Sequence, residues 1–130
     1  MTQLHHIGLT CSDIKISEKF YIENFGLEKT KEVSVPARLM MEIFGIDSLA
    51  KMVYLKAGNS MIELFDFPEA KDLKPAMGNI SHMALSVENR KEVFERMKSN
   101  GLKTILVDKG EGQFVYFVKD PDGVLIELKD

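Results

Sequence analysis

The feature that most constrains the fold of this chain is an internal repeat. The segment LHHIGLT, residues 4–10, has a counterpart in ISHMALS, residues 80–86. The matched positions are His6 with His82, Gly26 with Gly101, and Glu63 with Glu127. The spacing from the histidine to the glycine is 20 residues in the first half and 19 in the second. A period of this kind predicts two copies of one structural unit.

Each half has the pattern of a strand followed by a helix. Apolar residues alternate with small or polar ones in the two matched segments, which is typical of a half-buried strand. Residues 13–25 and 89–100 carry helical patterns. Ser12 or Asp13 and then Asn89 are the predicted N-caps, with Glu92 completing a capping box on Asn89. Gly26 and Gly101 stand where a helix end turns left-handed.

The remainder of each half predicts strands joined by tight turns. KAGN at residues 56–59 and DPDG at residues 120–123 each separate two apolar runs, as hairpin turns do. The resulting order is strand, helix and three strands, twice. We therefore predict one α+β domain over residues 1–130, built from two βαβββ modules in tandem at residues 1–67 and 78–130.

Strand alternation predicts which side each of the matched polar residues faces. His6 shares a side with Gly8, whereas Ile7 and Leu9 point toward the helix. His82 relates in the same way to its neighbours Ile80 and Ala84. Glu63 and Glu127 lie between apolar residues that face the helix, so they also point away from it. The predicted set on this side is His6, Glu63, His82 and Glu127.

Two imidazoles and two carboxylates suit a divalent transition metal ion. A single histidine on a strand is usually an ordinary, partly buried residue, but the repeated register favours a shared metal site. The predicted cofactor is zinc, nickel, cobalt or manganese. His5 points the opposite way in an ideal strand, so we interpret it as an edge or solvent-facing residue.

Composition narrows the classes of partner. Seventeen Lys and Arg against twenty Asp and Glu give a net charge of −3, without a basic run for nucleic acid. No apolar run approaches the length of a membrane span, and the single Cys11 cannot close an intramolecular disulfide. The default prediction is a cytoplasmic protein that binds neither nucleic acid nor membrane.

These motifs resemble the vicinal oxygen chelate superfamily. The resemblance rests on HHIGLTCSD, FYIENFGLE, MIELF, SHMALSVEN and FVKDPDGVLIEL, and it covers nearly the whole chain. It implies paired βαβββ modules whose mixed sheet curls around a metal-containing cleft. It also implies that His6 is a metal ligand together with Glu63, His82 and Glu127, while His5 is only a neighbour.

The complete ligand set resembles the isomerase branch of this superfamily, which includes glyoxalase I and methylmalonyl-CoA epimerase. In that branch a metal binds adjacent substrate oxygens and stabilises an enediolate or enolate, and a glutamate shuttles the proton. The implied catalytic residues are Glu127, which we favour as the base, and Glu63. The implied substrate is a thiol adduct or CoA thioester of an oxo acid or aldehyde.

Two other classes stay open on the sequence. An extradiol dioxygenase would need only two histidines and one carboxylate, so the extra Glu63 argues against it. A metal-free protein that sequesters a drug would lack the ligand set. Relatives of this length are commonly dimers, so we predict a homodimer, with the ligands of one site coming from one chain or from two.

Several further positions carry two interpretations each. The insertion SVPARLMMEIFGIDSLA, residues 34–50, is either core packing or a dimer contact, or else a lid over the metal. Arg38, Lys109 and Gln113 either border the cleft and meet an anionic part of a substrate or are solvated loop residues. We interpret Asp13 and Asp122 as a helix cap and a turn residue.

Overall fold

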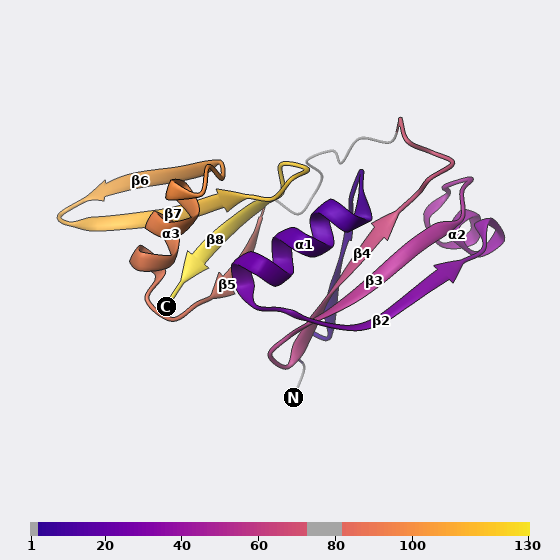
Figure 1. Ribbon diagram of the computed structural model, residues 1–130, viewed down its shortest axis with the longest axis horizontal. Helices are drawn as coiled ribbons and strands as arrows, with labels where there is room; N and C mark the ends of the chain where they lie inside the picture. The colour runs from indigo at the N-terminus through magenta and orange to yellow at the C-terminus, as the bar shows by residue number, and fades with distance from the viewer. Residues whose placement is uncertain (1–2, 73–81) are drawn as a thin grey trace. The chain divides into compact units, whose positions relative to one another are not determined.

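The computed structural model describes residues 3–72 and 82–130, and the chain divides into two compact units after Pro75. The elements of the first unit are β1 (His6–Thr10), α1 (Ile14–Phe25), β2 (Glu28–Val35), α2 (Ala37–Phe44), β3 (Ala50–Ala57) and β4 (Ser60–Asp66). Those of the second are β5 (Met83–Ser86), α3 (Arg90–Ser99), β6 (Thr104–Gly110), β7 (Gln113–Lys119) and β8 (Leu125–Lys129). The predicted βαβββ order is confirmed in both units, with α2 inside the predicted insertion (Figure 1). Ile80 and the predicted start of the second module at residue 78 lie outside the described residues.

Both units contain a four-stranded mixed sheet with the same topology. The strand order is β1-β4-β3-β2 in the first and β5-β8-β7-β6 in the second. The first strand of each unit pairs in parallel with the last, and the other pairs are antiparallel. The predicted turns join β3 to β4 and β7 to β8. Gly58 and Gly123 adopt positive φ angles of 61° and 86° there, which glycine tolerates without strain.

One face of each sheet is covered by a helix and forms the core. Ile14 and Tyr21 of α1 are buried, and α1 contacts β3 and β4. The buried strand residues on this side are Val53, Leu55, Ile62 and Leu64. In the second unit the buried helix residues Val93, Phe94 and Met97 face Tyr116, Val118, Ile126 and Leu128. Each large apolar side chain buried in this way contributes about 1.5–3 kcal/mol to the free energy of folding. This gain explains why the apolar residues of each strand are the ones that face the helix.

The helix ends follow local side-chain chemistry. Asp13 is the N-cap of α1, and its Oδ1 accepts hydrogen bonds from the backbone N–H groups of Lys15 at 2.9 Å and Ile16 at 3.2 Å. Asn89 caps α3 by accepting from the N–H of Glu92 at 3.3 Å, and its amide donates to the carboxylate of Glu92 at 2.9 Å. The predicted caps at Asp13 and Asn89 are confirmed. The predicted capping box is formed only in part, because the Glu92 carboxylate accepts from the side-chain amide of Asn89 and not from its backbone N–H. Within the described part of the chain, no helix is long and apolar enough to cross a membrane.

Helix α2 packs on the sheet face opposite α1. Its Met40 is buried in a cluster with Met52 and Phe65, which are paired across β3 and β4. These two residues alternate with Val53 and Leu64, which face α1, so they point to the other side. That side also carries Glu63. For residues 34–50, the interpretation as core packing therefore describes Met40. The cluster that Met40 joins lies on the same sheet face as Glu63, which is one of the predicted ligands.

Candidate metal centre

The first unit brings His6 and Glu63 together. His6 begins β1 and Glu63 lies in the middle of β4, the strand that pairs with β1 in parallel. His6 Nε2 is 3.5 Å from Glu63 Oε2, and the two side chains are 45% and 12% exposed. The imidazole is thus open to solvent while the carboxylate is largely covered, so one edge of the pair is accessible to a ligand.

The second unit repeats the arrangement with His82 and Glu127. His82 lies immediately before β5, and its Nε2 is 3.4 Å from Oε2 of Glu127 on β8. The side-chain exposures are 39% and 17%, close to those of the first pair. The other carboxylate oxygen of Glu127 lies 3.4 Å from Lys129 Nζ. Phe117, which is opposite Glu127 on β7, has its ring edge against the His82 imidazole, with 6.0 Å between ring centroids.

The two pairs occupy the same register position in their sheets. Glu63 is opposite Gly8, and Glu127 is opposite Ala84. Each histidine lies two residues before that small residue. A Cβ atom on Gly8 would lie 3.2 Å from a ring carbon of Phe65, so a larger residue at this position would require the Phe65 ring to shift. The backbone pairing therefore positions each histidine diagonally across from its glutamate.

The spacing within each pair fits two ligands of one metal ion. Two donor atoms about 2.1 Å from an ion lie about 3.4 Å apart at a tetrahedral angle and about 3.0 Å apart at an octahedral one. The observed separations are 3.5 and 3.4 Å. One imidazole and one carboxylate per pair are donors that borderline divalent ions accept. Among residues 3–72 and 82–130, no group of three or more histidine, cysteine or acidic side chains is placed to hold a metal ion, so the structure brings the four predicted ligands together only as two His–Glu pairs.

His5 takes part in this site in a way that the sequence interpretation missed. His5 Nδ1 lies 2.9 Å from His6 Nδ1, and the two rings meet edge to face at 82°. The prediction that His5 is an exposed residue is confirmed, but its ring turns back onto His6. The carbonyl of His5 still accepts a hydrogen bond from the N–H of Met61 on β4 at 3.0 Å, so the backbone pairing continues through this residue. Alternation determines the side of the strand from which the side chain leaves, but it does not determine the rotamer that turns the ring toward His6.

The other candidate residues have local roles within their own units. Asp13 and Asp122 are a helix cap and a turn residue, as predicted, with the Asp122 N–H donating to Asp120 Oδ1 at 2.8 Å. Arg38 lies on α2 and is 3.5 Å from Glu42. Lys109 and Gln113 are exposed residues of β6 and β7. The interpretation of these last three as loop residues is wrong, because all three belong to regular elements.

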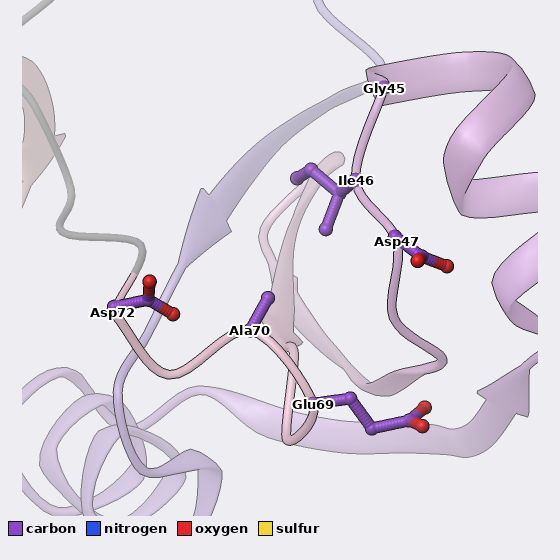
Figure 2. Close-up of a pocket in the computed structure, with 6 residues that line it drawn as sticks. All are labelled: Gly45, Ile46, Asp47, Glu69, Ala70 and Asp72. Atoms are coloured by element: carbon purple, nitrogen blue, oxygen red, sulfur yellow. The ribbon is translucent and has the colours of Figure 1, made fainter.

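A separate cavity of about 300 Å³ lies beside the segment that follows α2. Figure 2 shows its lining, which includes Asp47, Glu69 and Asp72 but none of the predicted metal ligands. The carboxylates of Asp47 and Glu69 lie on the right of the view and that of Asp72 lies on the left (Figure 2), and Glu69 accepts a hydrogen bond from the N–H of Leu49 at 3.0 Å. This cavity is therefore distinct from the two His–Glu pairs.

Comparison with known proteins agrees with the repeated architecture. The chain is 31% identical over 132 residues to the uncharacterized protein YaeR of Escherichia coli strain K12, covering 98% of this chain and 95% of that protein. It is 30% identical over 133 residues to lactoylglutathione lyase of Salmonella typhimurium, covering 97% and 90%.

Among solved structures, a mutant of the fosfomycin resistance protein FosX from Listeria monocytogenes, complexed with Mn(II) and 1S,2S-dihydroxypropylphosphonic acid, shares the fold. Its TM-score is 0.72 at 19% identity, with 99% of this chain and 92% of that chain covered. The family model described as "Glyoxalase/Bleomycin resistance protein/Dioxygenase superfamily" matches residues 3–128. The chain belongs to the glyoxalase/bleomycin resistance protein/dioxygenase superfamily, also called the vicinal oxygen chelate superfamily.

Proposed function

We propose that this protein is a metal-dependent lyase or isomerase of the glyoxalase I or methylmalonyl-CoA epimerase type. In this proposal, His6, Glu63, His82 and Glu127 bind one divalent ion. The observation that carries it is the occurrence of the same His–Glu pair, at the same register, in both units. A single His–Glu contact is ordinary on a protein surface. Its repetition on structurally equivalent strands supports the binding of one shared metal ion.

The proposed reaction moves a proton between carbon atoms of an oxo compound. A bound divalent ion supplies positive charge next to the substrate oxygens and so lowers the barrier to removing a proton from the neighbouring carbon. Glu127 accepts that proton on its carboxylate. In an isomerisation Glu127 returns the proton to the adjacent carbon, whereas in an epimerisation Glu63, in its protonated form, donates a proton to the opposite face of the same carbon. Glu63 is the alternative base, because it has the same kind of imidazole partner.

The proposed substrate is a thiol adduct or CoA thioester of an oxo acid or aldehyde. The relationship to a lactoylglutathione lyase supports the thiol adduct. An extradiol dioxygenase remains the second candidate among enzymes, yet it would leave one of the two carboxylates without a role. In a metal-free binding protein, neither His–Glu pair would have a functional role.

Metal analysis of single variants tests this proposal. Wild-type protein, purified without chelators, is expected to hold about one divalent ion per chain. The His6→Ala and His82→Ala variants are each expected to lose most of this ion. Removing a coordinating group lowers metal affinity at least as much as the ~10–100-fold that is typical for outer-shell partners. Glu95→Gln, an exposed change on α3, which covers the face of the second sheet opposite Glu127, is the control and should retain the ion. Inductively coupled plasma mass spectrometry measures the content.

The outcomes of this measurement separate the candidate functions. If wild-type protein binds no ion, the metal-dependent proposal fails and a ligand-sequestering protein becomes the better explanation. If only one histidine variant loses the ion, the two pairs do not share it. Proton exchange from the hemithioacetal of methylglyoxal and from methylmalonyl-CoA then distinguishes the two proposed branches.

We also propose that the chain forms a homodimer. Exposed apolar side chains gather on two elements, and they are Met41, Ile43 and Phe44 on α2 with Ile105, Leu106 and Val107 on β6. Exposed apolar patches of this kind frequently mark interfaces between proteins. Multi-angle light scattering at micromolar concentration is expected to give twice the chain mass of 14.7 kDa. A monomer under these conditions contradicts the proposal.

A further inference from the structure

The contact between His5 and His6 requires a definite arrangement of hydrogens. Their Nδ1 atoms are 2.9 Å apart, a hydrogen-bond distance between two nitrogens. In a neutral imidazole one nitrogen carries a hydrogen and the other a lone pair. One of the two Nδ1 atoms must therefore donate while the other accepts. The other ring nitrogen of His6, Nε2, faces Glu63 at 3.5 Å, so both of its nitrogens have assigned neighbours.

Two tautomeric arrangements satisfy the same positions of the heavy atoms. In the first, His6 Nδ1–H donates to His5, and His6 Nε2 presents a lone pair. In the second, His5 Nδ1–H donates to His6, and His6 Nε2 carries a hydrogen toward Glu63. Only the first arrangement leaves Nε2 able to bind a metal ion. The Nδ1 atom of His5 therefore lies where it can accept the Nδ1–H of His6 in the tautomer whose Nε2 binds a metal ion.

We propose that His5 is a positioning residue whose Nδ1 accepts the Nδ1–H of His6 and holds His6 Nε2 in the form that binds the metal. This inference rests on the proposed function, because it assumes an ion between His6 and Glu63. Histidines that bind metal ions commonly donate their second N–H to such an acceptor, which orients the ring and raises its basicity. Here the acceptor is the preceding residue in the chain.

The sequence offers no equivalent imidazole for the second pair. Ser81 precedes His82, and it lies outside the described residues, so His5 has no histidine counterpart in the repeat. The chain contains only three histidines. The effect of changing His5 is therefore expected at His6, with His82 as an internal reference in the same spectrum.

Two variants of His5 separate its hydrogen-bonding role from its bulk. Asparagine places its side-chain oxygen near the position of the imidazole Nδ1 and can accept the same hydrogen bond, whereas leucine has similar size but no acceptor. The His5→Leu variant is expected to bind Zn²⁺ about 10–100-fold more weakly than wild type, as is typical for loss of an outer-shell partner. The His5→Asn variant is expected to bind close to wild type. Competition with a chromophoric chelator measures both affinities.

Nitrogen-15 NMR of the imidazoles gives a readout that is independent of activity. With Zn²⁺ bound, His6 in wild type and in His5→Asn is expected to show a protected Nδ1–H and a metal-bound Nε2, whereas His5→Leu should lose the protection of the Nδ1–H. At saturating Zn²⁺, His82 is expected to remain metal-bound in all three proteins. Circular dichroism is expected to show that all three proteins are folded, because His5 is exposed.

The outcomes distinguish this inference from the proposed function. Equal Zn²⁺ affinity and an unchanged His6 spectrum in His5→Leu overturn the role of His5 while leaving the metal site intact. Weak binding in both variants also overturns it, because it would show that an acceptor alone does not suffice. If wild-type protein binds no ion, the proposed function fails and this inference fails with it.

Discussion

The Glu127→Gln variant is expected to show a kcat about 10²–10⁴-fold below wild type on the hemithioacetal of methylglyoxal or on methylmalonyl-CoA. Glutamine keeps the shape of the side chain and one oxygen that faces His82, but it does not accept a proton near neutral pH. In the proposed reaction the carboxylate must take and return the proton, so the loss should appear in kcat. Absorbance assays measure turnover, and metal analysis allows the rate to be expressed per bound ion.

The matched control for this prediction is Glu63→Gln. Glu63 has the same imidazole partner at nearly the same distance, and its exposure is similar. If Glu63→Gln loses turnover per bound ion while Glu127→Gln retains it, Glu63 is the base. Wild-type turnover in both variants contradicts proton transfer by either carboxylate.

Truncation of Phe94 to alanine is expected to lower the free energy of unfolding of the second unit by about 3–5 kcal/mol. Phe94 is 1% exposed, and its ring packs against that of Tyr116 with 5.2 Å between centroids. The change removes a buried ring from a sheet covered by a single helix, α3. Urea denaturation followed by circular dichroism measures the loss.

Lys91→Ala serves as the comparison for this core variant. Lys91 lies in α3 of the same unit but is exposed, so its truncation is expected to change the free energy of unfolding by no more than about 0.5 kcal/mol. A loss below about 1 kcal/mol in Phe94→Ala would show that α3 does not contribute a tightly packed core.

Much of the fold could be predicted because local pattern and tertiary packing agree along most of the chain. Ile7 and Leu9 alternate with His6 and Gly8, and the sheet has one face covered by α1, so alternation alone distinguishes the two sides. Asp13, Asn89 and Gly58 act through hydrogen bonds or φ angles within a few residues. Their roles therefore depend little on the rest of the molecule.

What the sequence did not predict depends on contacts that periodicity does not encode. The run LMMEIFGI has helical spacing, but that spacing does not say which face of a sheet a helix covers, and α2 covers the face opposite α1. The direction of the His5 ring was missed because alternation does not determine a side-chain rotamer. For the candidate site, the sequence identified the two His–Glu pairs, and the binding of one ion by both pairs stays a prediction.

Equivalent backbone register has a consequence for how such a site can evolve. Within each unit, the hydrogen-bond ladder between the first and last strands places a small residue opposite the glutamate and the histidine two residues before it. A duplicated gene segment would therefore inherit a complete His–Glu pair, while insertions elsewhere in either copy, such as α2, can diversify the surface around it.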